Sequence, residues 1–211
     1  MAKAKLKTRV AIFGAGGHGK VVLDILLESG VEVAGFLDDD PKKKGARVLG
    51  FPVLGGLDAL KGEKGVAVAL GVGSNAAREE IYGKAKRLGV EVVGAVHPKA
   101  AVSRFTKLGK GAVIMAGAAV NPGCELGDGV VVNTGATVDH DCRLGRFCQI
   151  WPGAHLAGSV SVGELAYVGT GAAVVPGIAI GASAIIGAGA AVVSDIPAGV
   201  TAVGVPARPR P

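Results

Sequence analysis

The sequence predicts two domains of different class: a small α/β domain over residues 1–97 and a coil of short parallel strands over residues 98–211. Three observations support this. Charged residues are dense up to about Lys110 and sparse after it, where Gly, Ala and Val dominate. Apolar strand-like runs alternate with helical segments in the first part, and a period of six residues governs the second. A chain of 211 residues is long enough to bury two small cores.

The elements of the first domain follow from apolar runs bounded by Gly, Pro, Asn and Asp. Helices are expected from about Gly17 to Ser29 and from about Ala76 to Leu88. Strands are expected at residues 10–13, 33–37, 66–70 and 92–96. Strands that alternate with helices predict a small parallel sheet with crossover helices.

The stretch "VAIFGAGGHGKVV", residues 10–22, contains a glycine fingerprint. Gly14, Gly16 and Gly19 fit G-x-G-x-x-G directly after a predicted strand, which is typical of a Rossmann-like domain. At the start of a helix such a loop offers backbone N–H groups to phosphate. Asp38 or Asp39, about 20 residues further on, is in place to accept a hydrogen bond from a ribose.

Two ligands fit this loop. An NAD-dependent reductase is one interpretation, but the domain ends near residue 97, too early for two mononucleotide-binding halves, and no later segment supplies a hydride-transfer site. A nucleoside diphosphate sugar is the other. The loop amides would hold its phosphates, His18 would add a donor, and Asp38 or Asp39 would accept from uracil or ribose.

The second domain has a strict six-residue period. Steps of six from Val102 to Val192 meet sixteen aliphatic residues without exception. This period matches neither the 3.6 residues of a helix turn nor a heptad, and it predicts short strands joined by tight turns. The position two residues before each aliphatic is nearly always small, and it includes Cys124, Cys142 and Cys148. Large and small side chains are therefore expected to alternate inside a narrow structure.

Glycines divide the repeat into groups of three turns. They recur at every third six-residue step, at Gly109, Gly127, Gly145, Gly163 and Gly181. One turn in three is therefore expected to need a backbone angle that only Gly adopts easily. Three six-residue sides per coil make a triangular prism, and the repeat predicts about five coils.

The cysteines predict no metal site, because neither C-x-x-C nor a His/Cys ligand spacing occurs. Cys124 and Cys142 are three six-residue steps apart and should stack on adjacent coils, at a separation that permits a disulfide. Buried, reduced thiols in the small interior column are the favoured interpretation.

Polar residues crowd one coil of the otherwise apolar repeat, in "VVNTGATVDHDCRLG", residues 131–145. Asn133, Asp139, His140 and Asp141 fall within nine positions. His140 is a candidate general base, since imidazole titrates near neutrality and a neighbouring carboxylate orients it. The alternative is that His140 and Asp141 decorate a solvent-facing turn, and that Asn133 occupies a left-handed turn position.

The repeat resembles the hexapeptide-repeat acyltransferases, which implies a left-handed parallel β-helix. With "GAGGHGKVV" in front, the chain is similar to sugar O- and N-acyltransferases of the sialic acid and bacillosamine acetyltransferase type. Those enzymes carry Asn, then seven residues later His, then Asp or Glu. Asn133, His140 and Asp141 match that pattern residue by residue.

The resemblance implies acetyl-CoA as co-substrate, a UDP-linked sugar as acceptor, and a homotrimer with active sites between subunits. The expected catalytic residues are His140 as base, Asp141 orienting it, and Asn133 or a backbone N–H steadying the oxyanion. The expected sugar-nucleotide residues are Gly14, Gly16, Gly17, His18, Gly19, Asp38 and Asp39. The expected acetyl-CoA residues are Gln149, where the family suggests His, and Gly158, Thr170 and Ala188.

The expected activity is N-acetylation of a UDP-4-amino-4,6-dideoxy sugar in surface glycan biosynthesis. One alternative is an O-acetyltransferase acting on sialic acid or another polysaccharide precursor. Another, of a different class, is a non-catalytic nucleotide-sugar-binding protein with a β-helical trimerisation stalk.

Composition excludes two other classes. The net charge is only +6 and aromatic residues make up 4% of the chain, so a nucleic-acid partner is not expected. Residues 165–194 carry no charge, but frequent Gly, Pro176 and the six-residue period argue against a membrane span. The basic start lacks a small-residue cleavage site, which predicts no signal peptide and a cytoplasmic protein.

Overall fold

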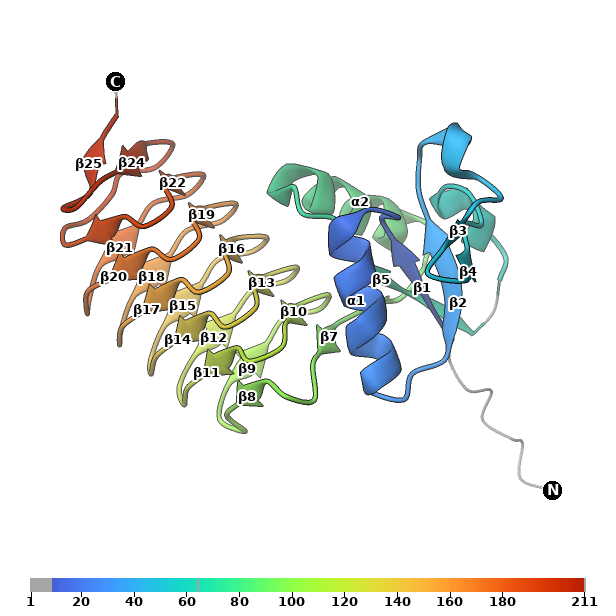
Figure 1. Ribbon diagram of the computed structural model, residues 1–211, viewed down its shortest axis with the longest axis horizontal. Helices are drawn as coiled ribbons and strands as arrows, with labels where there is room; N and C mark the ends of the chain where they lie inside the picture. Colours follow the sequence, from blue (N-terminus) through green and yellow to red (C-terminus); the bar gives the residue numbers. More distant parts are fainter. Residues whose placement is uncertain (1–8, 64, 211) are drawn as a thin grey trace. The chain divides into compact units, whose positions relative to one another are not determined.

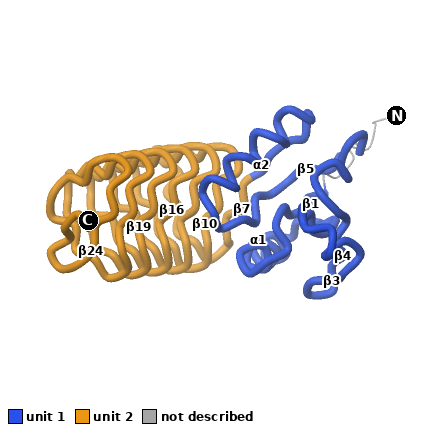
Figure 2. Tube along the Cα trace, turned by 90° about the horizontal axis from the view of Figure 1, so that it is seen from above, with its two compact units in different colours: residues 1–93 blue, residues 94–211 orange. Residues whose placement is uncertain are grey.

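The computed structural model describes residues 9–63 and 65–210. The chain divides into two compact units, residues 1–93 and 94–211 (Figure 2). The basic residues Lys3, Lys5 and Lys7, on which the expectation about a signal peptide partly rests, lie outside the described residues.

The first unit is a four-stranded parallel sheet in the order β2-β1-β5-β6 with two helices (Figure 1). The sheet strands are β1 Arg9–Phe13, β2 Val33–Leu37, β5 Val66–Leu70 and β6 Val92–Val93, and the helices are α1 Gly17–Glu28 and α2 Asn75–Arg87. A small antiparallel pair, β3 Arg47–Val48 and β4 Phe51–Pro52, and two 3₁₀ turns, Pro41–Lys43 and Leu57–Leu60, complete it. The predicted parallel α/β domain is confirmed.

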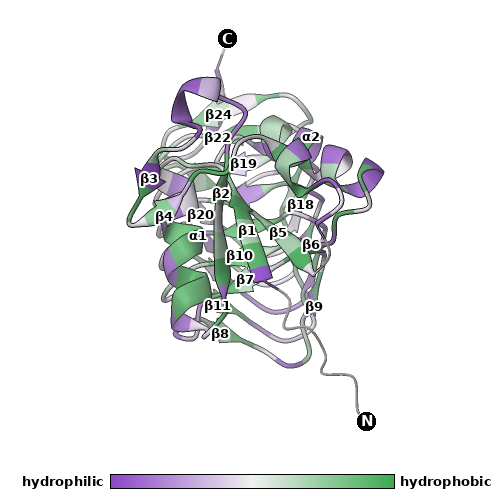
Figure 3. Cartoon of the chain, turned by 90° about the vertical axis from the view of Figure 1, so that its right-hand side faces the viewer, coloured by the Kyte–Doolittle hydropathy of each residue, from purple (hydrophilic) through white to green (hydrophobic). Residues whose placement is uncertain are grey.

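The core of this unit lies between the central strands and the helices. β1 is buried in all but Arg9, and β5 in all but Val66. Helix α1 buries one face, through Val22, Leu23, Ile25 and Leu26, and both strands are largely hydrophobic in Figure 3. Because the strands are parallel, the segments after β1, β2 and β5 all leave the same edge of the sheet.

The second unit is a three-sided parallel β-helix (Figure 1). The strands of its first side are β7 Ala95–Val96, β10 Val113–Ile114, β13 Val131–Val132, β16 Gln149–Ile150, β19 Tyr167–Val168, β22 Ile185–Ile186 and β24 Thr201–Val203, with β25 Arg208–Pro209 antiparallel to β24. The second side holds β8 Ala101–Val102, β11 Ala119–Val120, β14 Thr137–Val138, β17 His155–Leu156, β20 Ala173–Val174 and β23 Ala191–Val192. The third side holds β9 Lys107–Leu108, β12 Glu125–Leu126, β15 Arg143–Leu144, β18 Ser161–Val162 and β21 Ala179–Ile180.

The prism has about six coils rather than five. β7 pairs with β10 through Ala95 and Val113, so residues 94–97 belong to this unit although the sequence analysis assigned them to the first domain. At the other end, Ile196 forms a bridge with Ile180 after β23. The six-residue step therefore extends back from Val102 to Val96, whereas after Val192 the coiling continues with a shorter step, because Ile196 follows Val192 by four residues.

The interior of the prism alternates large aliphatic and small side chains, as predicted. One continuous cluster runs from Ile114 to Ala207 and includes all three cysteines, which are free thiols with no exposed surface. Leu108, in the first coil, is 39% exposed. The uncharged segment 165–194 forms coils of the prism. Among the described residues, no helix combines the length and hydrophobicity needed to cross a bilayer.

The expected reason for the glycines at every third step was wrong. None of the five has a φ in the left-handed range. Instead, a Cβ at Gly145 would lie 2.5 Å from Glu164 N, and one at Gly127 would lie 2.8 Å from Arg146 N. These positions need Gly because the backbone of the next coil passes too close for a side chain.

The left-handed position lies two residues further on in every turn, from residue 111 to residue 189 in steps of six. Gly occupies most of these positions, and the exceptions are Asp141, Phe147, Ser159, Leu165 and Ser183. Asp141, with φ 60°, is thus a non-glycine residue at a position that favours Gly.

Candidate active site

The candidate catalytic residues His140 and Asp141 lie in the turn between β14 and β15, in the third coil. Aspartate tolerates the left-handed conformation better than most residues because its short polar side chain bonds locally. Here its carboxylate turns back onto the preceding residue. His140 Nδ1 lies 2.9 Å from Asp141 Oδ2, and the two side chains are 59% and 65% exposed.

Electrostatics favour the protonated form of His140. The hydrogen bond from Asp141 raises the pKa of the imidazole, slight burial opposes this, and the charges of Asp139 and Asp141 raise it further. Because Nδ1 is engaged by the carboxylate, Nε2 is the nitrogen left to exchange a proton with a ligand. The pair therefore has the arrangement of an oriented general base.

Gly158 lies directly over the imidazole, one coil further along. A Cβ at this position would be 2.6 Å from both Cε1 and Nε2 of His140. The N–H of Gly158 forms no hydrogen bond within the described part of the chain. The exposed imidazole of His140 therefore packs against the backbone of the buried Gly158. Gly158 was expected to contact acetyl-CoA, and here it makes room for the base.

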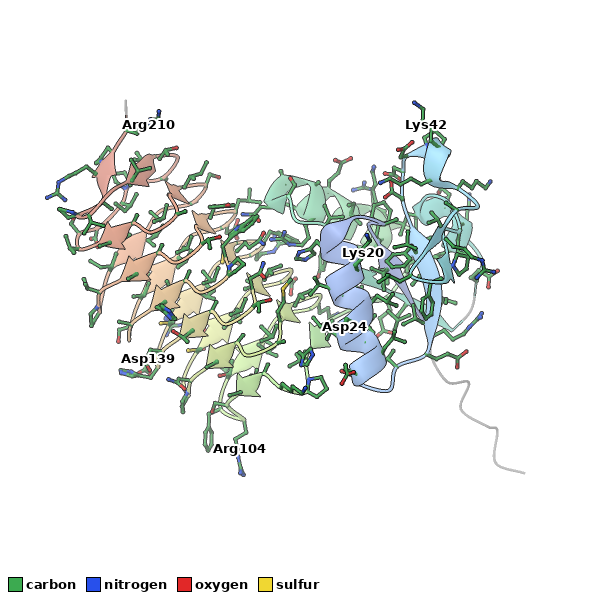
Figure 4. The ribbon with its side chains drawn as sticks, in the orientation of Figure 1. Lys20, Asp24, Lys42, Arg104, Asp139 and Arg210 are labelled. Carbon is green, nitrogen blue, oxygen red and sulfur yellow. The ribbon has the colours of Figure 1, made fainter. Side chains whose placement is uncertain are left out.

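Asp139 holds the start of the same turn. Its Oδ1 accepts the N–H of His140 at 2.8 Å and the Nδ2 of Asn121 at 2.7 Å. These two bonds, that of Asn121 first, hold the pKa of Asp139 below its ordinary value. Asp139 projects from the outside of the coil in Figure 4. Asn121 was not recognised from the sequence, although its spacing of three six-residue steps from Asp139 places it directly on the preceding coil.

Asn133 is not brought to His140 within one chain. It lies at the opposite end of β14, in the preceding turn, where its Oδ1 accepts the N–H of Thr134 at 2.8 Å and only 9% of it is exposed. Thr170 and Ala188 are exposed and stack on successive coils in that same column of turns. Gln149 is 1% exposed, and its Oε1 has no partner among the described residues.

Two glycines of the loop after β1 lie against neighbouring backbone, and two others face open space. Gly14 has a φ of 112°, and a Cβ there would overlap Gly71 O, while a Cβ at Gly19 would overlap Gly14 O. Gly16 and Gly17 have no atom within 4 Å of a built Cβ. Helix α1 begins at Gly17, so the N–H groups of its first turn lack intrahelical acceptors and are available to an anion.

The two aspartates after β2 have different surroundings. Asp38 Oδ2 accepts the N–H of Ala15 at 3.0 Å and Lys43 Nζ at 2.8 Å, and Oδ1 accepts the N–H of Asp40 at 3.0 Å. Partial burial opposes ionisation, but these bonds together hold the pKa of Asp38 below its ordinary value. The Asp39 side chain is 57% exposed and lies 3.6 Å from Lys84. Asp38 thus anchors the glycine loop, and Asp39 is the more exposed of the two carboxylates.

His18 is neutral at physiological pH. Burial first, and the charge of Arg78 second, lower its pKa to about 4. Its Nε2 is buried without a partner among the described residues. His18 therefore supplies a hydrogen bond at most, and no positive charge, to a phosphate.

Arg78 was missed by the sequence analysis. It is fully buried in α2, and its guanidinium donates to Asn75 Oδ1 at 2.9 Å and to Val72 O at 3.2 Å. These bonds fix the turn after β5. A signal was present in the sequence, since Ser74 caps α2 and Arg78 follows one helical turn later.

The described residues contain no group of three or more His, Cys, Asp or Glu side chains able to hold a metal ion.

Known protein families match parts of both units of the chain. The PglD N-terminal domain family matches residues 9–85, and the bacterial transferase hexapeptide family (six repeats) matches residues 105–140. A UDP-N-acetylbacillosamine N-acetyltransferase of Bacillus subtilis is 40% identical over 113 residues, or 51% of each chain. The match thus spans about half the length of that curated relative.

Solved structures match over nearly the whole chain. PerB from Caulobacter crescentus, in complex with CoA and GDP-perosamine, is 46% identical with a TM-score of 0.91, covering 96% of this chain and 97% of PerB. The acetyltransferase domain of PglB from Neisseria gonorrhoeae, in complex with acetyl coenzyme A, is 41% identical with a TM-score of 0.91, covering 97% of this chain and 100% of that domain. The chain belongs to the hexapeptide-repeat sugar acyltransferases, left-handed parallel β-helix proteins that carry a PglD-type N-terminal domain.

Proposed function

We propose that this protein transfers the acetyl group of acetyl-CoA to the amine of a nucleotide-linked amino sugar. The observation that carries the proposal is the hydrogen-bonded pair of His140 and Asp141, with the unpartnered N–H of Gly158 beside the ring. The relatives support it, since full-length matches are described with CoA and GDP-perosamine or with acetyl coenzyme A.

His140 acts as the general base in this proposal. The neutral sugar amine attacks the thioester carbonyl carbon, a C–N bond forms, and Nε2 of His140 takes a proton from the nitrogen. Asp141 keeps Nδ1 protonated and stabilises the imidazolium that results. When the C–S bond of the tetrahedral intermediate breaks, the imidazolium returns the proton to the departing thiolate, and free CoA and the acetamido sugar are released.

The N–H of Gly158 is the group best placed to stabilise the oxyanion. It lies beside the imidazole and has no hydrogen-bond acceptor within the described part of its own chain. A backbone donor held in a regular coil is preorganised, which is what oxyanion stabilisation requires. Asn133, the other candidate, lies in a different turn of the same coil and bonds to Thr134. In the proposed homotrimer, Asn133 would act only from a neighbouring subunit.

The first unit binds the nucleotide in this proposal. The first-turn N–H groups of α1 donate hydrogen bonds to the diphosphate, for which Gly16 and Gly17 leave space, and Asp39 accepts a hydrogen bond from the ribose or base. Gln149, Thr170 and Ala188 remain the candidates for acetyl-CoA contacts across the subunit groove. The reaction is placed in the cytoplasm, where acetyl-CoA is available.

A panel of acceptors tests the proposal. The protein is incubated with acetyl-CoA and, separately, with a UDP-4-amino-4,6-dideoxy sugar, GDP-perosamine and sialic acid, and release of the CoA thiol is followed. The proposal predicts release with a nucleotide-linked amine, and the UDP sugar is the expected acceptor. The GDP sugar is included because the 46% identical relative was solved with GDP-perosamine. Release with sialic acid alone would establish the O-acetyltransferase, and binding of nucleotide sugar without any release would establish the non-catalytic protein.

A further inference from the structure

Two side chains of the preceding coil are tied to the turn that presents His140, in addition to the main-chain bond from the N–H of Asp141 to Pro122 O at 3.1 Å. Asn121 follows β11, one full coil before Asp139, and donates its Nδ2–H to Asp139 Oδ1 at 2.7 Å. The same oxygen accepts the backbone N–H of His140 at 2.8 Å. One carboxylate oxygen therefore links a side chain of the second coil to the main chain of the proposed base.

The second tie reaches the other side of the same peptide unit. Cys124 Sγ, in the interior of the second coil, donates to the main-chain carbonyl of Asp139 at 3.0 Å. The peptide joining Asp139 to His140 is thus held at its carbonyl by a thiol and at its N–H by a carboxylate that Asn121 fixes in place. Burial raises the pKa of Cys124, so this thiol stays protonated and able to donate.

Asn121 is itself held by a residue of the first coil. Thr106 Oγ1 donates to the main-chain carbonyl of Asn121 at 2.9 Å, which repeats one coil earlier the bond that Cys124 makes. Along the column of turns that holds Asn121 and Asp139, the next residue is Ala157, whose methyl group makes no hydrogen bond. The link between side chains of this column therefore ends at Asp139, although the interior bond recurs once more, from Cys142 Sγ to the main-chain carbonyl of Ala157 at 3.2 Å.

Resting on the proposed function, we propose that Asn121 is a positioning residue of the acetyl transfer: through Asp139 it holds the main chain of His140 so that Nε2 meets the acceptor amine. Asn121 does not touch the reacting atoms. Its contribution is the orientation of a base whose side chain is otherwise exposed and tied only to Asp141. A misplaced general base lowers the rate of the chemical step and leaves substrate binding unchanged.

The test compares three variants of the full chain. Asn121→Ala removes the donor, and Asn121→Asp keeps the size of the side chain but replaces the donor with a second carboxylate. Glu125→Ala is the matched control, because Glu125 joins the same two coils through Arg143 at 2.8 Å, on another side of the prism. Asn121 and Glu125 both lie at the surface, so all three variants are expected to fold, which circular dichroism checks.

Two measurements are made on each variant. Steady-state kinetics with the accepted sugar should show kcat lowered about tenfold in both Asn121 variants, with KM for both substrates unchanged, and parental values in Glu125→Ala. The second measurement needs no substrate. The backbone amide shift of His140, followed by NMR against pH, reports protonation of Asp139. The pH midpoint of this titration should be higher in Asn121→Ala, because Asp139 loses its hydrogen-bond donor. It should be higher still in Asn121→Asp, because a like charge is added beside Asp139.

Each outcome decides the proposal. The proposal is overturned if kcat of Asn121→Asp lies within about twofold of the parent value. It is also overturned if kcat falls as much in Glu125→Ala as in the Asn121 variants. If the parent acetylates none of the acceptors, the proposed function has failed, and the amide titration alone then decides whether Asn121 fixes the turn. If the midpoint in the Asn121 variants equals that of the parent and of Glu125→Ala, the role of Asn121 in fixing the turn is overturned as well.

Discussion

His140 combines a raised pKa with an exposed side chain, and single neighbours account for both properties. Asp141 raises its pKa through a hydrogen bond that a left-handed backbone makes possible, and Asp139 adds its charge. Gly158 leaves space for the ring from the following coil. The base therefore depends on neighbours in its own turn and on two residues, Asn121 and Gly158, that each lie one full coil away from a member of that turn.

The pH dependence of the rate tests Asp141. In the proposed reaction His140 must be neutral to act as the base, and its pKa is raised, so the rate should fall on acidification with a midpoint above the ordinary histidine value of about 6.5. In Asp141→Asn the raising hydrogen bond is weakened, so the midpoint should move to lower pH while the maximal kcat falls about 100-fold. An acid limb at the same pH in both proteins would contradict the assignment. The measurement is kcat against pH from 5 to 9 at saturating substrate.

Gly158→Ala tests the space above the imidazole. Because the added Cβ would lie 2.6 Å from Nε2, the ring has to move, and kcat is expected to fall about tenfold or more. Gly158 has no left-handed φ, so the thermal unfolding midpoint should change little. Glu164→Ala, in a turn of the same coil but at a different corner, is the control and should keep parental kinetics. Full activity in Gly158→Ala would show that the ring position is not needed.

Substitutions of Asp38 and Asp39 should have different effects on the KM for the nucleotide sugar and on thermal unfolding. Asp38→Ala frees the N–H of Ala15 and loosens the glycine loop, so KM for the nucleotide sugar should rise about tenfold and the unfolding midpoint should fall. Asp39→Ala removes an exposed carboxylate, so the same KM should rise with no change in unfolding. Equal stability effects in the two variants would contradict the division into an anchor and a ligand contact.

At the scale of elements, the turns of the prism show what sequence periodicity reveals and what it hides. The glycine at every third six-residue step correctly marks one corner of the triangle, but the physical cause is close approach of the next coil and not backbone angle. Glycines recurring at a fixed spacing look the same in a sequence whether they are needed for a left-handed backbone angle or for close approach of the next coil. Only the position of the neighbouring backbone distinguishes them, and that position is a property of the stacked coils.

A pair of glycine substitutions makes this distinction measurable. Gly145→Ala places a Cβ 2.5 Å from the main-chain N of Glu164, which cannot move aside as a side chain would, so the expected loss of stability exceeds about 3 kcal/mol. Gly171→Ala adds a methyl group to open space at a φ of 66° and should cost about 1 kcal/mol. Thermal unfolding of both variants gives the comparison. A larger loss for Gly171→Ala would contradict the expectation that the close backbone approach at Gly145 costs more stability than a left-handed φ.

For the whole molecule, the parallel α/β unit, the three-sided prism and the choice of His140 as candidate base could be predicted from the sequence, because each depends on local periodicity or on one short motif. The sequence did not reveal Asn121 or Arg78, whose importance arises from contacts between segments. The choice between Asp38 and Asp39 also required the structure, since both follow the same strand and only their partners differ. The role expected of Asn133 depends on a neighbouring subunit, which a single chain does not contain.

The proposed homotrimer is a prediction at this scale. Light scattering of the purified protein is expected to give three times the chain mass of 20.8 kDa. A monomer with full activity would contradict the placement of the active sites between subunits, and would leave Asn133 without a catalytic role.

Release of the CoA thiol from acetyl-CoA and a UDP-4-amino-4,6-dideoxy sugar, measured for the parent and for His140→Ala side by side, is the decisive test of the proposed acetyl transfer. The parent is expected to release CoA, and the variant is expected to do so at a rate at least about 100-fold lower, with unchanged binding of the nucleotide sugar. Equal rates in the two proteins would contradict this expectation, because the base would then lie elsewhere.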